Sequence, residues 1–130
     1  MRKVARGIII DKKRILLIYR FKEERMYYVL PGGGIEDNET PYEAMIREAK
    51  EETNLDVNID KLLFEFDDSM NYGYYFLCNA QGDLKLGGPE FYRQSKQNIY
   101  ELVWIPLNQL EEMNLVPRGA RDRIIELFRK

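Results

Sequence analysis

Short runs of β-branched and aromatic residues recur along the chain and predict a series of strands. The runs cover residues 4–10, 15–21, 26–30, 57–66, 72–79 and 99–105. The polar residues 11–14 separate the first two runs, which therefore predict a β-hairpin. The third run stops at Pro31 and three successive glycines, a composition typical of a turn or of backbone that approaches a ligand closely.

The segment that follows the glycines has the features of a helix start. Thr40 suits the N-cap, Pro41 suits the first helical position, and Glu43 completes a capping box. The helix should end near Thr53, because Asn54 readily adopts the left-handed conformation of a helix end.

A second amphipathic helix is expected near the C-terminus, over residues 120–128, and a short helix over residues 107–113. The apolar positions expected to be buried in the C-terminal helix are Ile124, Ile125, Leu127 and Phe128. Strands combined with two main helices predict the α/β class, with a mixed sheet and helices packed on its faces. No linker divides the chain, so we expect one domain over residues 1–130.

The first helix divides into three faces at about 100° per residue. The face expected to meet the core carries Tyr42, Met45, Ile46, Ala49 and Thr53. The opposite face, expected to lie in solvent, carries Glu43, Arg47 and Lys50. Beside the core face, a third face combines Ala44 with three carboxylates, Glu48, Glu51 and Glu52.

These three glutamates oppose helix formation. Like charges at this spacing cost about 0.2–0.5 kcal/mol per pair, and an anion in the last helical turn costs about 0.3–1 kcal/mol. A helix whose charges oppose its own stability, without a local compensating interaction, indicates a functional site. Carboxylates without histidine or thiolate neighbours favour a hard divalent cation, Mg²⁺ or Mn²⁺, and a carbonyl of the glycine run offers a further oxygen ligand.

The composition excludes several other chemistries. The chain has no histidine and one cysteine, Cys78, which excludes His-ligated zinc, Ser-His-Asp triads and a disulfide within this chain. The formal net charge is −2, so no overall field attracts nucleic acid, which is not expected as a partner. No apolar run approaches membrane-spanning length. Together with the lone thiol and the absence of a secretory signal, this predicts a cytoplasmic protein.

Gly33, Glu39 and residues 47–55 together resemble the Nudix box. Five residues separate Gly33 from Glu39, seven more follow, and the segment Arg-Glu-Ala-Lys-Glu-Glu-Thr-Asn-Leu completes the match over residues 33–55. Six of the seven fixed positions of the box agree. The seventh, usually glycine, is Asn54, which also suits a left-handed helix end. The order of the predicted strands around the box also resembles the Nudix hydrolase superfamily.

The resemblance implies a Nudix-type α/β/α sandwich with a mixed sheet. It also implies metal-dependent hydrolysis of a nucleoside diphosphate linked to another moiety, which releases a nucleoside monophosphate. The implied metal ligands are the Gly32 carbonyl, Glu48, Glu51 and Glu52, of which Glu51 binds directly or through water.

The resemblance assigns supporting roles to other residues. Arg47 would orient the glutamates and Glu39 would support the loop. The attacking water would lose its proton to Glu51, Glu52 or a glutamate outside the box. For that outside position Glu90 is the first choice and Glu101 the second.

Contacts to the remainder of the substrate stay open at this point. Arg20, Lys22 and Arg93 are candidates for outer phosphates, and the backbone at Gly33 for close approach to the substrate. Aromatic candidates for stacking a base are Tyr27, Tyr28, Tyr92 and Trp104, although aromatics also fill the faces of a sheet. The choice stays open among oxidised nucleoside triphosphates, nucleotide sugars, dinucleoside polyphosphates, coenzyme derivatives and capped RNA.

Two alternative functions compete with hydrolysis. One is a catalytically silent, nucleotide-binding regulatory module of the same fold, which usually lacks box glutamates that are present here. The other is an acidic cation-binding surface, which would need neither the glycine run nor Arg47. Family members are often homodimers, so the resemblance also allows a homodimer.

Overall fold

The structure is a computed structural model that describes residues 1–88 and 94–129. Its elements are β1 (Arg2–Asp11), β2 (Arg14–Lys22), β3 (Arg25–Val29), β4 (Gly32–Gly34), α1 (Pro41–Thr53), β5 (Asp56–Asp67), β6 (Asn71–Gln81), β7 (Asn98–Pro106), the 3₁₀ helix η1 (Leu107–Glu112) and α3 (Arg118–Phe128). The expected strands and helices are therefore present. The glycine run, expected as a turn or loop, forms the short strand β4 instead.

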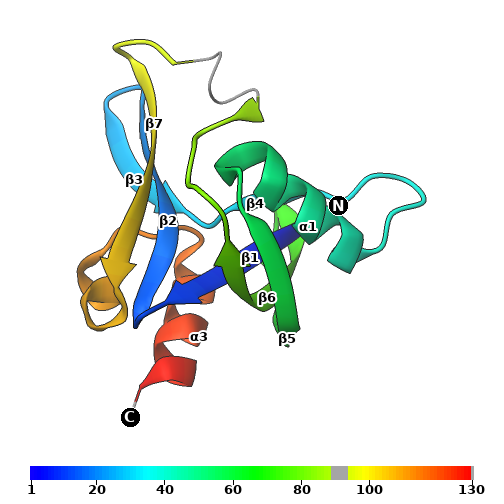
Figure 1. The fold of residues 1–130 in the computed structure, drawn as a ribbon. Helices are drawn as coiled ribbons and strands as arrows, with labels where there is room; N and C mark the ends of the chain where they lie inside the picture. The colour runs from blue at the N-terminus through cyan, green and yellow to red at the C-terminus, as the bar shows by residue number, and fades with distance from the viewer. Residues whose placement is uncertain (89–93, 130) are drawn as a thin grey trace.

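The predicted hairpin is correct at its turn but not along its length. β1 and β2 pair at Ile10 with Ile15 and at Asp11 with Arg14. Beyond this point β1 lies antiparallel to β4 and parallel to β6, whereas β2 pairs with β3 and β7. The sheet is consequently mixed, as predicted, and it opens where β1 leaves β2 (Figure 1).

Helices cover both faces of this sheet. Ala5 and Ile9 of β1 pack into one apolar core with the buried residues of α1. Ile8 of the same strand packs into a second core with Ala120 and Ile124 of α3. Successive strand residues point to opposite faces, so one strand supplies both cores and the α/β/α layering follows. Figure 1 shows α1 beside β4 and β5, well separated from α3.

The predicted core face of α1 is partly wrong. Tyr42 and Ile46 are each 49% exposed, whereas Ala44 is fully buried. Met45, Ala49 and Thr53 are buried as expected, so the helix is rotated only partly, and Ala44 and Glu52 join them toward the sheet. The glycines of β4 explain this rotation, because a strand without side chains leaves room for carboxylates.

The C-terminal helix also departs from its expected face. Ile124 is fully buried as expected, but Leu127 is 50% exposed. The core of this layer reaches α3 mainly through Ala120 and Ile124, so the apolar stripe is narrower than the sequence indicated. Cys78 is buried in β6, as expected for a small apolar residue.

Candidate active site

The site is built on β4, whose three residues are all glycine. Gly32 has a φ of +143°, a conformation that other residues rarely adopt. A Cβ at Gly32 would also collide with the carbonyl oxygen of Ala5 in the paired strand β1. A Cβ at Gly33 would lie 2.7 Å from either carboxylate oxygen of Glu48. The glycines therefore let α1 bring its acidic side chains directly against the backbone.

Glu52 is the most deeply placed of the three glutamates. It is 6% exposed, and its Oε1 accepts a hydrogen bond of 2.6 Å from the Gly32 N–H. A buried carboxylate requires such compensation, because burial without a partner would favour the neutral form. The side chain of Glu48 is 16% exposed, and that of Glu51 is 49% exposed. The exposure of the three carboxylates therefore increases from Glu52 through Glu48 to Glu51.

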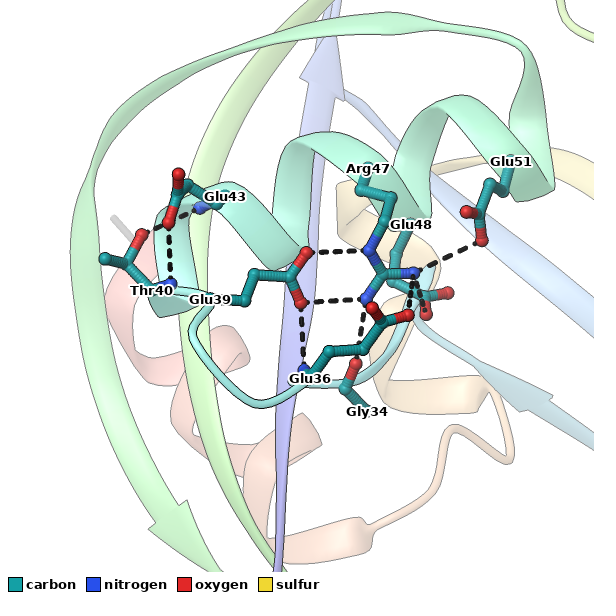
Figure 2. Close-up of polar contacts among 8 residues, drawn as sticks. All are labelled: Gly34, Glu36, Glu39, Thr40, Glu43, Arg47, Glu48 and Glu51. Carbon is teal, nitrogen blue, oxygen red and sulfur yellow. Dashed lines mark hydrogen bonds and ion pairs between the residues drawn. The ribbon is translucent and has the colours of Figure 1, made fainter.

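Arg47 lies at the centre of the acidic cluster, as Figure 2 shows. Its Nε and Nη2 donate to the two oxygens of Glu39, at 2.7 and 3.0 Å. Its Nη1 donates to Glu48 at 3.0 Å and to Glu51 at 3.3 Å. Its Nη2 also donates to the Gly34 carbonyl at 3.0 Å. The expectation that Arg47 faces solvent is therefore wrong, since its side chain is only 25% exposed.

The Arg47–Glu39 pair shifts the pKa values of both of its members. Hydrogen bonding by Arg47, and then by the Glu36 N–H, lowers the pKa of Glu39 from 4.5 to about 2. The bond to Glu39 in turn raises the pKa of Arg47. Glu39 also accepts the Glu36 N–H at 2.9 Å, so it joins the loop before α1 to the helix itself. The structure thus connects Glu39 to both the loop and Arg47 by direct bonds.

Backbone N–H groups of residues 85–87 cap the C-terminal end of α1, a contact that the sequence did not predict. The Lys85 N–H donates to the Thr53 carbonyl at 2.9 Å, and the Gly87 N–H donates to the Glu52 carbonyl at 3.0 Å. A Cβ at Gly87 would lie 2.5 Å from the Glu51 carbonyl oxygen. These donors satisfy carbonyls that a helix end leaves unpaired, in the turn where Glu51 and Glu52 add negative charge.

Arg20 lies on β2 in an aromatic setting. Its guanidinium carbon is 3.7 Å from the ring centroid of Tyr100 and 5.7 Å from that of Tyr27. One Nη donates to the Asn98 Oδ1 at 2.8 Å. The buried Nε has no hydrogen-bond partner among the described residues. A planar cation with an unused buried donor is suited to an anionic ligand such as phosphate.

Several sequence candidates lie apart from the carboxylates. Tyr28 packs with the α3 core and its ring meets that of Tyr19 at 5.4 Å, edge to face. Trp104 packs against the α1 core beneath Arg14. Glu101 is exposed on β7, beside the segment 84–86. Glu90, Tyr92 and Arg93 lie outside the described residues.

The donor set has the oxygen chemistry that a hard divalent cation requires, although the carboxylates do not converge. Among residues 1–88 and 94–129, no three acidic, histidine or cysteine side chains are arranged to hold a metal ion. The reason is visible in the hydrogen bonds: Arg47 attracts Glu48 and Glu51, whereas Glu52 turns to the Gly32 N–H. A bound cation would take the place of Arg47 Nη1 as the partner of these carboxylates. The oxygen ligands fit such an ion.

Comparison with known proteins gives the same family as the box. The NUDIX domain model matches residues 1–127, so the chain belongs to the NUDIX domain family. It is 39% identical over 128 residues to nudix hydrolase 1 of Caenorhabditis elegans, covering 93% of this chain but 33% of that protein. It is 36% identical over 72 residues to the 8-oxo-dGTP diphosphatase of Proteus vulgaris, covering 50% of this chain and 64% of that one. The chain thus spans a third to two-thirds of the length of these relatives.

The fold has solved counterparts. A MutT structure from work on Aliivibrio salmonicida and Vibrio cholerae superposes with a TM-score of 0.77 over 98% of both chains, at 20% identity. The expected Nudix-type α/β fold is therefore confirmed. Nudix hydrolases generally use divalent metal ions. No helix in the described part of the chain is long and apolar enough to cross a membrane.

Proposed function

We propose that residues 1–130 form one Nudix unit that hydrolyses a nucleoside diphosphate linked to another moiety, with Mg²⁺ or Mn²⁺ as cofactor. The observation that carries the proposal is the buried Glu52, bonded to the Gly32 N–H, beside Glu48 packed over Gly33. This arrangement has a high local charge and a glycine strand that leaves room for a ligand. The family membership supports the same activity.

In this proposal Glu48, Glu51, Glu52 and the Gly32 carbonyl hold the cation. When bound, a divalent cation neutralises diphosphate charge and lowers the pKa of a water ligand. Arg47 keeps Glu48 and Glu51 oriented until the cation binds, through the bonds it already makes to both. Glu39 holds Arg47 by two bonds and fixes its position.

The reaction needs a base for the attacking water. Water forms a new bond to phosphorus, the bridging P–O bond breaks, and a nucleoside monophosphate and a phosphorylated remainder leave. A carboxylate oxygen of Glu51 accepts the water proton in this scheme, because half of that side chain is open to solvent. Glu52 and Glu90 are the alternative bases, followed by Glu101.

Arg20 and Arg93 bind phosphate oxygens in the proposed complex. For Arg20 the support is its buried, unpartnered Nε and the aromatic rings that hold its guanidinium flat. The backbone of Gly33 allows close approach of the substrate, since this residue has no side chain of its own. Tyr28 stacks on the base in the proposed complex, and Tyr27 and Tyr100, whose rings lie beside Arg20, are the alternatives.

The test is a panel of nucleoside diphosphate and triphosphate compounds, assayed with Mg²⁺ or Mn²⁺ and with product identification. The panel includes 8-oxo-dGTP, since the Proteus vulgaris relative is named for that substrate. Glu52→Gln should reduce kcat about 10²- to 10⁴-fold on the substrate that wild type hydrolyses. Glu126→Gln, at an exposed glutamate of α3, is the matched control and should leave kcat unchanged.

The alternative function makes a different prediction in the same assay. A silent regulatory module would bind nucleotides with equal affinity in wild type and Glu52→Gln and release no phosphate product. That result would reject the hydrolase proposal. Turnover that is independent of added metal would reject the assignment of the glutamates.

A further inference from the structure

Residues 83–87, between β6 and β7, belong to no helix or strand. Among the described residues, this segment makes three hydrogen bonds, and all three join it to the C-terminal end of α1. Two are the bonds from the backbone N–H groups of Lys85 and Gly87 to carbonyls of the last helical turn. The third comes from a side chain, because the Asn54 Nδ2 donates to the Asp83 carbonyl at 2.8 Å. The position of the segment therefore depends on the end of α1.

Asn54 does more than end the helix. As the C-cap of α1 it has a φ of +67°, and its N–H donates to the Lys50 carbonyl at 3.0 Å. Glycine, the usual residue at this position of the box, adopts the same conformation and makes the same backbone bond. Glycine has no side-chain donor, however, so it cannot bind the Asp83 carbonyl. The amide of Asn54 thus makes a contact that the helix end itself does not require.

The turn before the segment follows the same contact. Gly82 has a φ of +111°, and a Cβ at this position would lie 3.5 Å from the Asn54 carbonyl oxygen. The backbone of this turn therefore passes close to the C-cap and presents the Asp83 carbonyl to the Asn54 amide. Beyond it, Leu84 packs against the apolar core of α1.

The segment forms one wall of an open groove of about 450 Å³. Residues 84–86 line one side of the groove, and residues 100–103 of β7 line the other. In the described part of the chain, β2 is the one strand that pairs with β7, so the groove runs along the free edge of β7. The width of the groove is therefore set by the position of residues 84–86, which no strand holds.

This groove lies between two parts of the proposed active site. On one side, Leu86 of the wall is followed by Gly87, whose N–H donates to the Glu52 carbonyl at 3.0 Å. On the other side, the ring of Tyr100 lies 3.7 Å from the guanidinium carbon of Arg20, the proposed phosphate ligand. A substrate that contacts both the glutamates of α1 and Arg20 therefore lies along the groove.

We propose that Asn54 is a positioning residue for substrate binding, because its amide holds residues 83–87 against α1 and thereby fixes one wall of the groove. The inference rests on the proposed function, since the ligand of the groove is the substrate of that site. Asn54 acts through the segment and not on the reacting atoms. Loss of its amide should therefore raise KM and leave kcat close to the wild-type value.

The test variant is Asn54→Gly, which keeps the left-handed cap and removes the side-chain donor. On the substrate that the panel identifies, KM should rise about 2- to 12-fold, the range that corresponds to loss of one hydrogen bond. Both kcat and the affinity for Mn²⁺ should stay within about twofold of wild type, because the bond from the Gly32 N–H to Glu52 is unchanged.

Two further variants separate the amide donor from the rest of the contact. Asp83→Ala is the matched control: the bonded atom of Asp83 is its backbone carbonyl, which alanine retains, so KM should equal that of wild type. Asn54→Asp keeps the size of the side chain and tolerates the left-handed conformation, but its carboxylate cannot donate. It should raise KM at least as much as Asn54→Gly.

Amide hydrogen exchange tests the same contact without substrate. In Asn54→Gly the Lys85 and Gly87 amides should exchange about 2- to 12-fold faster than in wild type. The Gly32 amide, which donates to Glu52, should keep its wild-type rate. Equal acceleration of the amides within α1 would show that Asn54 acts on the helix alone, and would overturn the proposal.

Failure of the proposed hydrolysis is distinguished by binding. If no compound of the panel is cleaved, that proposal fails, and the Kd of ADP with Mg²⁺, measured by calorimetric titration, takes the place of KM. An increase of this Kd in Asn54→Gly but not in Asp83→Ala would support the positioning role of Asn54 even then. An unchanged KM or Kd in a folded Asn54→Gly, or unchanged exchange at Lys85 and Gly87, would overturn it.

Discussion

The two main helices are held in place by different interactions. α1 has a complete capping box between Thr40 and Glu43, a left-handed C-cap at Asn54, and further backbone donors at its C-terminal end. α3 has no side-chain bond at its N-cap and is anchored by the buried side chains of Ala120 and Ile124. α1 therefore adds hydrogen bonds and glycine contacts to its apolar packing, whereas α3 relies mainly on apolar packing.

The largest expected effect on stability lies in α3. Ile124→Ala removes a fully buried side chain from the second core and should reduce the free energy of unfolding by about 2–5 kcal/mol. The value is measured by urea denaturation. Activity per folded molecule should stay at the wild-type level, because Ile124 is remote from the carboxylates. A fall in kcat under conditions where the variant is fully folded would contradict the separation of the two helices.

An effect of intermediate size is expected when alanine replaces either of two glycines, one beside α1 and one in α3. The two variants compare the two helices directly. Gly33→Ala places a methyl group 2.7 Å from the Glu48 carboxylate, and Gly119→Ala places one against Cζ of the Phe66 ring, a tighter contact. Overpacking should cost either variant about 1–3 kcal/mol of unfolding free energy. Only Gly33→Ala should also weaken Mn²⁺ binding, about 10- to 100-fold, because it displaces a proposed ligand. Calorimetric titration with Mn²⁺ measures this difference.

A smaller effect is expected at the helix cap. Thr40→Ala removes the side-chain acceptor of the Glu43 N–H, a bond of 3.1 Å, and should reduce the free energy of unfolding by about 1 kcal/mol. Thr40→Asn retains a capping oxygen and should recover most of the loss. If Thr40→Ala denatures at the same urea concentration as wild type, the capping bonds do not hold α1.

The smallest effect concerns pH. The pKa of Glu39 is lowered from 4.5 to about 2 by the Arg47 hydrogen bond, followed by the Glu36 N–H. A lowered pKa contributes stability that is present above pH 4.5 and lost as the pH falls toward 2. The stability difference between wild type and Glu39→Gln should therefore shrink over this interval. Urea denaturation at several pH values measures it, and a constant difference would show that Glu39 titrates normally.

The sequence predicted most elements that depend on neighbours along the chain. The limits of α1, its capping box and the left-handed Asn54 all agree with the prediction, because each depends on residues within about four positions. The spacing of Glu48, Glu51 and Glu52 likewise follows from the helical repeat. The box motif correctly indicated the family.

Features that depend on distant residues were predicted less well. Tyr42 and Ile46 were expected in the core and are half exposed, because the orientation of α1 depends on the glycines of β4. Arg47 was expected in solvent, yet it lies among carboxylates from the helix and the preceding loop. A helical wheel contains neither the glycine strand nor the loop, so it cannot give the rotation of the helix.

The sequence by itself determined the helix, its caps and the concentration of acidic residues, since these arise from short-range backbone geometry and composition. Tertiary structure decided which carboxylate is buried, because Glu52 meets Gly32 across twenty residues of chain. It also joined the Asn54 amide to the Asp83 carbonyl, twenty-nine residues further along the chain. Local hydrogen bonds fix the elements, whereas the contacts between elements fix the direction in which each side chain points.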